Sequence, residues 1–184
     1  MVKLLCVIIF NKQYNITNAA YELSSYGFFQ RSNIKEICTF ACKEFAKRCI
    51  DNYQVLQYMN FNIYALTNNK YTITCVSDEE YPITAAKSFL NKVIDIINYD
   101  NVDNVDNKIE ELLIECQDPM KADKLIAIKN ELEETKEILM KTMEDLLNRG
   151  ESLDNLIEKS NELSNNSKSF MKETKKMNSC CNII

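Results

Sequence analysis

Hydrophobic positions in the first hundred residues predict several strands. Residues 2–10 form a run of Leu, Val, Ile and Phe, which is typical of a buried strand. A weaker strand is expected over residues 19–25. Residues 53–67 and 71–77 are rich in Tyr, Val, Ile, Phe and Thr, and Asn68-Asn69 between them indicates a tight turn, so these are expected to be antiparallel strands.

Two helices accompany these strands. Arg31-Ser32-Asn33 offers a polar start for a helix over residues 34–49, and Pro82 stands in the first turn of a second helix. At 100° per residue, Phe40 falls among charged residues and would be offered to something outside the core. The opposite face, which should cover the sheet, gathers Ile34, Ile37, Cys38, Ala41, Phe45 and Cys49.

After the second helix the composition becomes more polar. Residues 100–107 read DNVDNVDN and indicate a flexible connection, and a short helix is expected over residues 108–116. From Pro119 onward the composition is that of one long helix. The whole pattern predicts an α+β fold, an antiparallel sheet flanked by helices, followed by a long coiled-coil helix.

Apolar and small residues then repeat alternately every three and four positions over residues 125–177. Such a 3.5-residue repeat keeps one seam toward partner helices, and no helix of similar length exists within this chain. Sixteen seam layers fit without a break: Leu125, Ile128, Leu132, Thr135, Leu139, Thr142, Leu146, Arg149, Leu153, Leu156, Ser160, Leu163, Ser167, Phe170, Thr174 and Met177.

Arg149 stands in the middle of this seam, between Leu146 and Leu153. A buried guanidinium is costly unless its donors are met, and four copies of it in one layer would repel one another. Partner helices with neutral acceptors such as Gln are therefore indicated, and the charge would fix the register. A homodimeric coiled-coil scaffold remains the alternative, although the small and polar seam residues would leave a two-stranded seam weak.

The run DLLNRGESLDNL over residues 145–156, within a seam from Leu125 to Met177, resembles the R-SNAREs. The resemblance implies that Arg149 meets three glutamines from Q-SNARE helices. Zippering of the four-helix bundle toward Met177 would then draw two membranes together.

Composition and charge exclude other functions. The net charge of -5 is spread along 184 residues and gives no basic patch for nucleic acid. The chain has no histidine, which lowers the expectation of an enzyme or a metal site. Neither a signal peptide nor a membrane-spanning run of about 20 residues is found, so the eight cysteines are expected to be thiols in a reducing cytosol.

The chain ends SCCNII, which fits a C-a-a-X box. Cys181 is the expected prenylation site and Cys180 the expected palmitoylation site, because two lipids are needed for stable attachment. Lys172, Lys175 and Lys176 would add attraction to anionic headgroups. Asn182 is polar where an aliphatic residue is usual, and terminal Ile184 does not decide between farnesyl and geranylgeranyl. The alternative is an ordinary terminus with two exposed thiols.

With YGFFQR at residues 26–31 and DEEYP at residues 78–82, nearly the whole chain resembles the lipid-anchored longin-type R-SNAREs, cytosolic synaptobrevin homologues with a CC-a-a-X end. The resemblance implies a longin regulatory domain over 1–117, an R-SNARE motif over 118–178 and a lipidation tail over 179–184. In the family the longin domain folds back onto the SNARE segment and lipid. Phe40 would then line a hydrophobic groove and hold the closed form.

The resemblance also implies partners and location. The partners are three Q-SNARE helices, a SNARE-disassembly adaptor and its ATPase, and a membrane surface reached through lipid. The expected location is the cytoplasm and the cytoplasmic face of Golgi, vesicle and other endomembranes. Covalent prenyl and palmitoyl groups are expected, and no other cofactor.

Two enzyme-like readings are weaker. Cys38, Cys42 and Cys49 could suggest zinc, but they share the apolar face of one helix and are expected to be buried structural thiols. The acids Asp78-Glu79-Glu80 are expected to form a solvated turn before a helix. Relatives of this type have been credited with assisting palmitoyl transfer, but the sequence shows no base to activate a cysteine. No enzymatic activity is predicted.

Overall fold

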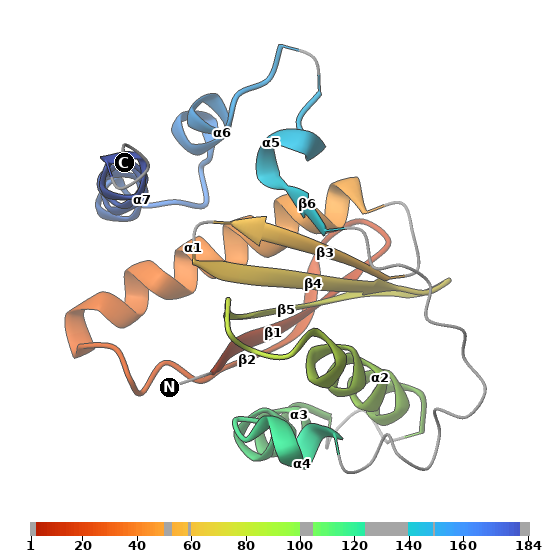
Figure 1. Ribbon diagram of the computed structural model, residues 1–184. Coiled ribbons are helices and arrows are strands. Elements are labelled where there is room, and N and C mark those ends of the chain that lie inside the picture. The colour runs from red at the N-terminus through yellow and green to blue at the C-terminus, as the bar shows by residue number, and fades with distance from the viewer. Residues whose placement is uncertain are drawn as a thin grey trace.

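A computed structural model describes residues 3–49, 53–58, 60–99, 105–123, 140–148 and 150–180. These residues form a six-stranded sheet in the order β2-β1-β5-β4-β3-β6 (Figure 1). The first five strands pair antiparallel, and β6 joins the edge strand β3 in parallel. The strands are β1 (Leu4–Asn11), β2 (Ile16–Tyr21), β3 (Tyr53–Tyr58), β4 (Phe61–Thr67), β5 (Tyr71–Asp78) and β6 (Met140–Thr142).

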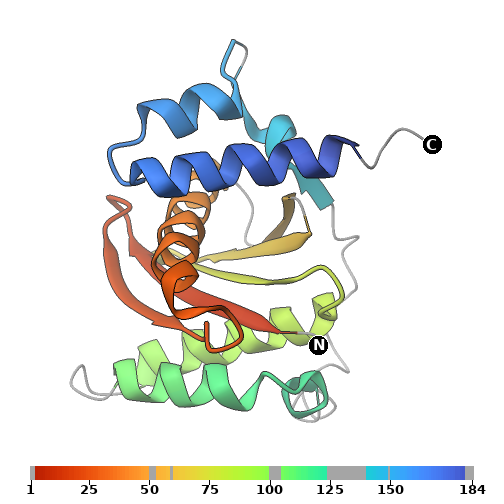
Figure 2. The ribbon, with the colours of Figure 1, turned by 90° about the vertical axis from the view of Figure 1, so that its left-hand side faces the viewer.

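Helices form layers on both faces of the sheet. One face is covered by α1 (Phe28–Arg48), and the other by α2 (Ile83–Tyr99), α3 (Val105–Glu115) and α4 (Pro119–Asp123). A further layer lies on the outer side of α1 (Figure 2). It consists of α5 (Met143–Leu146), α6 (Leu153–Lys159) and α7 (Asn165–Cys180).

Strand β1 lies inside the sheet, between β2 and β5, and is buried on both faces. Val7 and Ile9 pack in the cluster with α2 and α3, whereas Ile8 and Phe10 pack in the cluster with α1. Because successive side chains of a strand point to opposite faces, a strand covered on both sides is apolar throughout. The run at residues 2–10 was therefore correctly predicted to be a buried strand.

Several predicted boundaries were wrong. Strand β2 begins at Ile16 rather than residue 19, and the predicted strand over residues 53–67 is two antiparallel strands, β3 and β4. Helix α1 begins at Phe28, because the Gly27 carbonyl accepts the backbone N–H groups of Gln30 and Arg31. The Arg31 side chain instead ties down the preceding loop by donating to the carbonyls of Ser24 and Tyr26.

The turn at Asn68 was correct: its side-chain oxygen accepts the N–H groups of Lys70 and Tyr71, each at 2.8 Å. The connection predicted over residues 100–107 is shorter than expected. Helix α3 begins at Val105, whose side chain is buried in the cluster formed with α2. Burial of that one apolar residue favours an earlier helix start than the polar composition suggested.

The α+β class with an antiparallel sheet flanked by helices is confirmed. The long helix that should follow it is not continuous in this conformation, because residues 140–180 form a short strand and three separate helices. A heptad helix buries its seam against partner helices, and here the segment packs on α1 instead. Residues 124–139 lie outside the described part of the chain.

Candidate functional site

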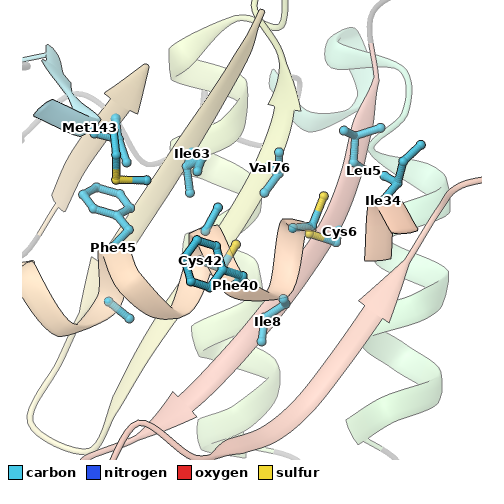
Figure 3. Packing of buried hydrophobic residues seen from close by; sticks show 14 of the residues in the cluster. Leu5, Cys6, Ile8, Ile34, Phe40, Cys42, Phe45, Ile63, Val76 and Met143 are labelled. Atoms are coloured by element: carbon cyan, nitrogen blue, oxygen red, sulfur yellow. The ribbon is translucent and has the colours of Figure 1, made fainter. Parts of the chain in front are cut away.

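The candidate site is the contact between α1 and the C-terminal segment, defined as residues 140–180. Figure 3 shows Met143 of this segment in one cluster with Phe40 and Phe45 of α1. The segment buries five apolar side chains in that cluster. They are Met143, Leu153, Ile157, Leu163 and Met171, each at most 5% exposed.

Phe40 lies on the face of α1 that the C-terminal segment covers. Residues three and four apart share one face of a helix, so Phe40 stands between Glu36 and Lys43. Glu36 accepts hydrogen bonds from Ser164 and Ser167, and Lys43 forms an ion pair with Glu162. The Phe40 ring is only 4% exposed. The chain's own C-terminal segment therefore covers this ring, which the sequence had placed outside the sheet core.

Glu36 binds the start of α7. One oxygen of its carboxylate accepts the Ser164 N–H at 2.9 Å and the Ser167 hydroxyl at 2.7 Å. Burial by itself raises the pKa of Glu36, but these hydrogen bonds outweigh it, and the net pKa lies below the ordinary 4.5. A carboxylate at a helix N-terminus also interacts favourably with the helix dipole.

The depressed pKa of Glu36 makes a pH-dependent prediction. A carboxyl whose folded pKa is lowered stabilises the closed form above its unfolded pKa, and this stabilisation is lost as the pH falls through the folded pKa. The Ser164 amide proton should report this ionisation in an NMR titration, with a midpoint below 4.5. Glu36→Gln should abolish that transition, and a midpoint at or above the ordinary value would contradict the assignment.

A second polar contact lies at the C-terminal end of α1. Arg48 contacts Glu44 within α1 and reaches Glu151 of the C-terminal segment at 3.4 Å. Glu44 is buried, which raises its pKa, but Lys47 and Arg48 outweigh burial and lower the pKa overall. The same Glu151 carboxylate accepts the Asn148 N–H at 3.0 Å. The middle and the C-terminal end of α1 thus hold the segment with charged groups.

An apolar cavity of about 240 Å³ lies between α1, the sheet and α7. Its lining includes the polar side chains of Thr174 and Asn60 beside the rings of Tyr26, Tyr58 and Phe61. Ile34, Ile37, Cys38 and Ala41 of α1 face Phe170 and Met171 of α7 across it. Apolar cavities of about 150 Å³ can stay dry and hold an apolar guest such as benzene.

The predicted seam is divided between buried and exposed positions. Leu153 and Leu163 are buried, Leu146 and Leu156 are half-buried, and Phe170 is 37% exposed. Of Met177 and Cys180 only the backbone in α7 is described. The predicted residues outside the described part of the chain are Leu125, Ile128, Leu132, Thr135, Leu139, Arg149 and Cys181.

The prediction from sequence missed Glu36 and three anchors of the C-terminal segment, Met143, Ile157 and Met171. Glu36 offered no signal, because a charged residue on a helix reads as solvated surface. The three anchors did offer one, since each directly follows a predicted seam residue.

The cysteines of α1 lie in the core. Cys38 and Cys42 are buried and meet Cys6 of β1, which sequence reasoning had not placed with them. Contact with their thiols, together with burial, raises the pKa of Cys6 well above its ordinary value. Within the described residues no group of three or more His, Cys, Asp or Glu side chains could hold a metal.

The acids Asp78, Glu79 and Glu80 lie at the end of β5 and in the turn before α2, where Glu79 accepts from the Gln57 amide. Among the helices that the structure describes, none is long and apolar enough to span a bilayer.

Comparison with known proteins matches both halves of the chain. A family model described as Regulated-SNARE-like domain (Longin) covers residues 23–99, and one described as Synaptobrevin covers residues 124–182. VAMP-like protein YKT61 of Arabidopsis thaliana is 38% identical in an alignment of 180 positions that covers 92% of this chain and 90% of the relative. Synaptobrevin homolog YKT6 of Saccharomyces cerevisiae is 34% identical, over 89% of this chain and 88% of the relative.

Proposed function

The chain belongs to the longin-type R-SNAREs, which act with other SNAREs in vesicle trafficking, and we propose that it alternates between this closed form and a membrane-fusing four-helix bundle. The observation that carries the proposal is the unbroken seam around Arg149. In the bundle, three Q-SNARE helices surround that seam. Their glutamines accept from the Arg149 guanidinium, which is otherwise costly to bury.

The closed form and the bundle compete for the same residues. Leu153, Leu163 and Ser167 belong to the predicted seam, and all three are buried in the closed form. A seam residue cannot pack on α1 and on a Q-SNARE helix at once. The closed form therefore inhibits bundle formation, because the two states exclude each other. Phe40 stabilises the closed form, because its ring is buried on the face of α1 that the segment covers.

The proposed membrane anchor is a prenyl group on Cys181 with a palmitoyl group on Cys180. Helix α7 ends at Cys180, and Phe170, Met171 and Thr174 of the same helix line the apolar cavity. We propose the cavity as the resting place of the prenyl chain in the closed form. Release of the prenyl chain would make the tail available to a membrane, where the second lipid makes attachment stable.

We propose partners and locations from family membership. They are three Q-SNARE helices, a disassembly adaptor with its ATPase, and the cytoplasmic faces of Golgi, vesicle and other endomembranes. The domains proposed are a longin domain over 1–117, the R-SNARE motif over 118–178 and the lipidation tail over 179–184. The relatives are SNAREs, which are not enzymes.

Mixing experiments test the proposal. The full chain, combined with three Q-SNARE helices, is expected to yield one complex with a single copy of each helix in native mass spectrometry. Arg149→Leu should yield several stoichiometries, because the charge no longer penalises self-association or a shifted register. Self-association of the wild-type chain without a heteromeric complex would instead favour the coiled-coil scaffold.

A further inference from the structure

A second regular pattern runs beside the predicted seam. Every second seam residue, from Thr142 to Phe170, is followed by a residue that we call its flanking position. Positions seven residues apart lie on one side of a coiled-coil helix. Large apolar and small residues alternate at these positions, which are Met143, Gly150, Ile157, Ser164 and Met171.

The large flanking residues are the anchors of the closed form. Met143 and Ile157 are each 1% exposed and Met171 is 2% exposed. Their seam neighbours are more accessible: Thr142 is exposed, Leu156 is half-buried and Phe170 is 37% exposed. The C-terminal segment therefore contacts the longin domain through this flanking stripe in addition to the seam residues Leu153 and Leu163. A bundle that buries the seam leaves this stripe at its rim.

Gly150 marks the first break of the helix. The Asn148 carbonyl accepts the Glu151 N–H at 2.9 Å, and Gly150 at the third position of this turn has a φ of 90°. Residues other than Gly and Asn generally avoid such a positive φ. A Cβ at Gly150 would meet no atom within 4 Å. A larger residue would thus be opposed by the backbone conformation alone.

Ser164 marks the second break. It stands between α6 and α7, where its hydroxyl accepts the Ser167 N–H at 3.3 Å and its own N–H binds Glu36. Ser is a favoured residue at helix starts and a weak one within helices. Helices α6 and α7 run in opposite directions over α1 (Figure 2). This reversal lets anchors far apart in sequence reach one helix.

We propose that the flanking positions encode the closed form separately from the seam, with Met143, Ile157 and Met171 as anchors and Gly150 and Ser164 as breaks. The inference rests on the proposed function, because it assigns these residues to one of the two competing states. The balance between closed form and bundle can then be shifted by residues that the bundle does not bury. Mutations at flanking positions should change that balance without weakening the bundle.

The first test uses hydrogen exchange of residues 140–180 in the full, unlipidated chain. Gly150→Ala should shift the closed-to-open ratio by about thirtyfold or more toward the open form, because Ala disfavours positive φ and favours helix. Gly150→Asn is the matched control, since Asn tolerates positive φ and is a poor helix former. Equal exchange in the Ala and Asn variants would overturn the role of Gly150.

The second test compares Ile157→Ala with its seam neighbour, Leu156→Ala. Ile157→Ala should open the closed form about thirtyfold or more and leave the melting temperature of the Q-SNARE bundle unchanged. Leu156→Ala should lower the melting temperature of the bundle and should open the closed form less than Ile157→Ala does, because Leu156 is only half-buried there. Protection of β1 and β5 in the same exchange data shows that the longin domain remains folded. If both variants weaken both states alike, the flanking positions have no separate role.

The two tests separate this inference from the proposed function. Failure of the wild-type chain to form any bundle would defeat the proposed function, and with it the assignment of anchors to one of two states. Exchange in Gly150→Ala and Gly150→Asn does not depend on a bundle. A formed bundle that Ile157→Ala destabilises as much as Leu156→Ala does would defeat the inference alone.

Discussion

Replacing Phe40 with glutamate is expected to release residues 140–180 from α1 while the sheet stays folded. The ring is 4% exposed. It lies on the face of α1 where Glu36 binds Ser164 and Lys43 pairs with Glu162. An unpaired charge buried at that contact would cost roughly 3 to 5 kcal/mol. The protein can avoid this cost by opening, which returns residue 40 to water. The closed form should therefore become more than about a hundredfold less populated.

The measurement is hydrogen exchange of the C-terminal segment, followed by fractionation of the lipidated protein between cytosol and membranes. Phe28→Glu is the matched control, because Phe28 lies on the same helix and is 79% exposed. Only Phe40→Glu should raise exchange and move the lipidated protein to membranes. Unchanged partitioning of Phe40→Glu, or an equal response to Phe28→Glu, would show that Phe40 does not hold the closed form.

Local pattern was sufficient for much of the longin domain. The run at residues 2–10 and the helix after Pro82 appear as β1 and α2, because their patterns follow from burial on a sheet that covers them directly. Boundaries failed where a distant contact or a backbone carbonyl decided them. Gly27 starts α1 through its carbonyl, and Val105 starts α3 by entering the core. Neither feature leaves a periodic signal.

The site was predictable only in one of its two states. The heptad seam predicts how residues 125–177 would pack with partner helices. It does not predict how they fold without partners. The side of α1 that carries Phe40 was identified from sequence, since a large ring among charges is unusual there. The segment that covers Phe40 could not be derived from periodicity, because the contact between Glu36 and Ser164 joins residues more than a hundred positions apart in the chain.

The conflict between the two states has a physical origin in the composition of the segment. Its seam contains small and polar residues such as Thr142, Ser160 and Ser167. A lone helix with such a seam gains little from its own packing, so most of its stability must come from a surface that it covers. The longin domain and, in the proposed bundle, the Q-SNARE helices offer alternative surfaces. The proposed prenyl chain would add a third component, because the cavity beside α7 offers it an apolar site.

Filling the apolar cavity is expected to have opposite consequences in lipidated and unlipidated protein. Ala41 of α1 is 3% exposed and lines the 240 Å³ cavity between the sheet and α7. Cavities of about 150 Å³ accept benzene, so Ala41→Phe can place its ring there. In the Cys181→Ser background, which cannot be prenylated, this variant should keep or increase the protection of α7 against hydrogen exchange.

In prenylated protein the same ring competes with the lipid. Each methylene group displaced into water costs about 0.8 kcal/mol, so displacing four of them costs about 3 kcal/mol. That is enough to move most of the prenylated Ala41→Phe variant from cytosol to membranes. Ala19→Phe, at an exposed position on β2, is the control. It should change neither the protection of α7 in the unprenylated protein nor the membrane partitioning of the prenylated protein. If Ala41→Phe leaves the prenylated protein cytosolic, the prenyl chain rests elsewhere; if it opens the unprenylated protein, the ring does not fit and the cavity is not a preformed lipid site.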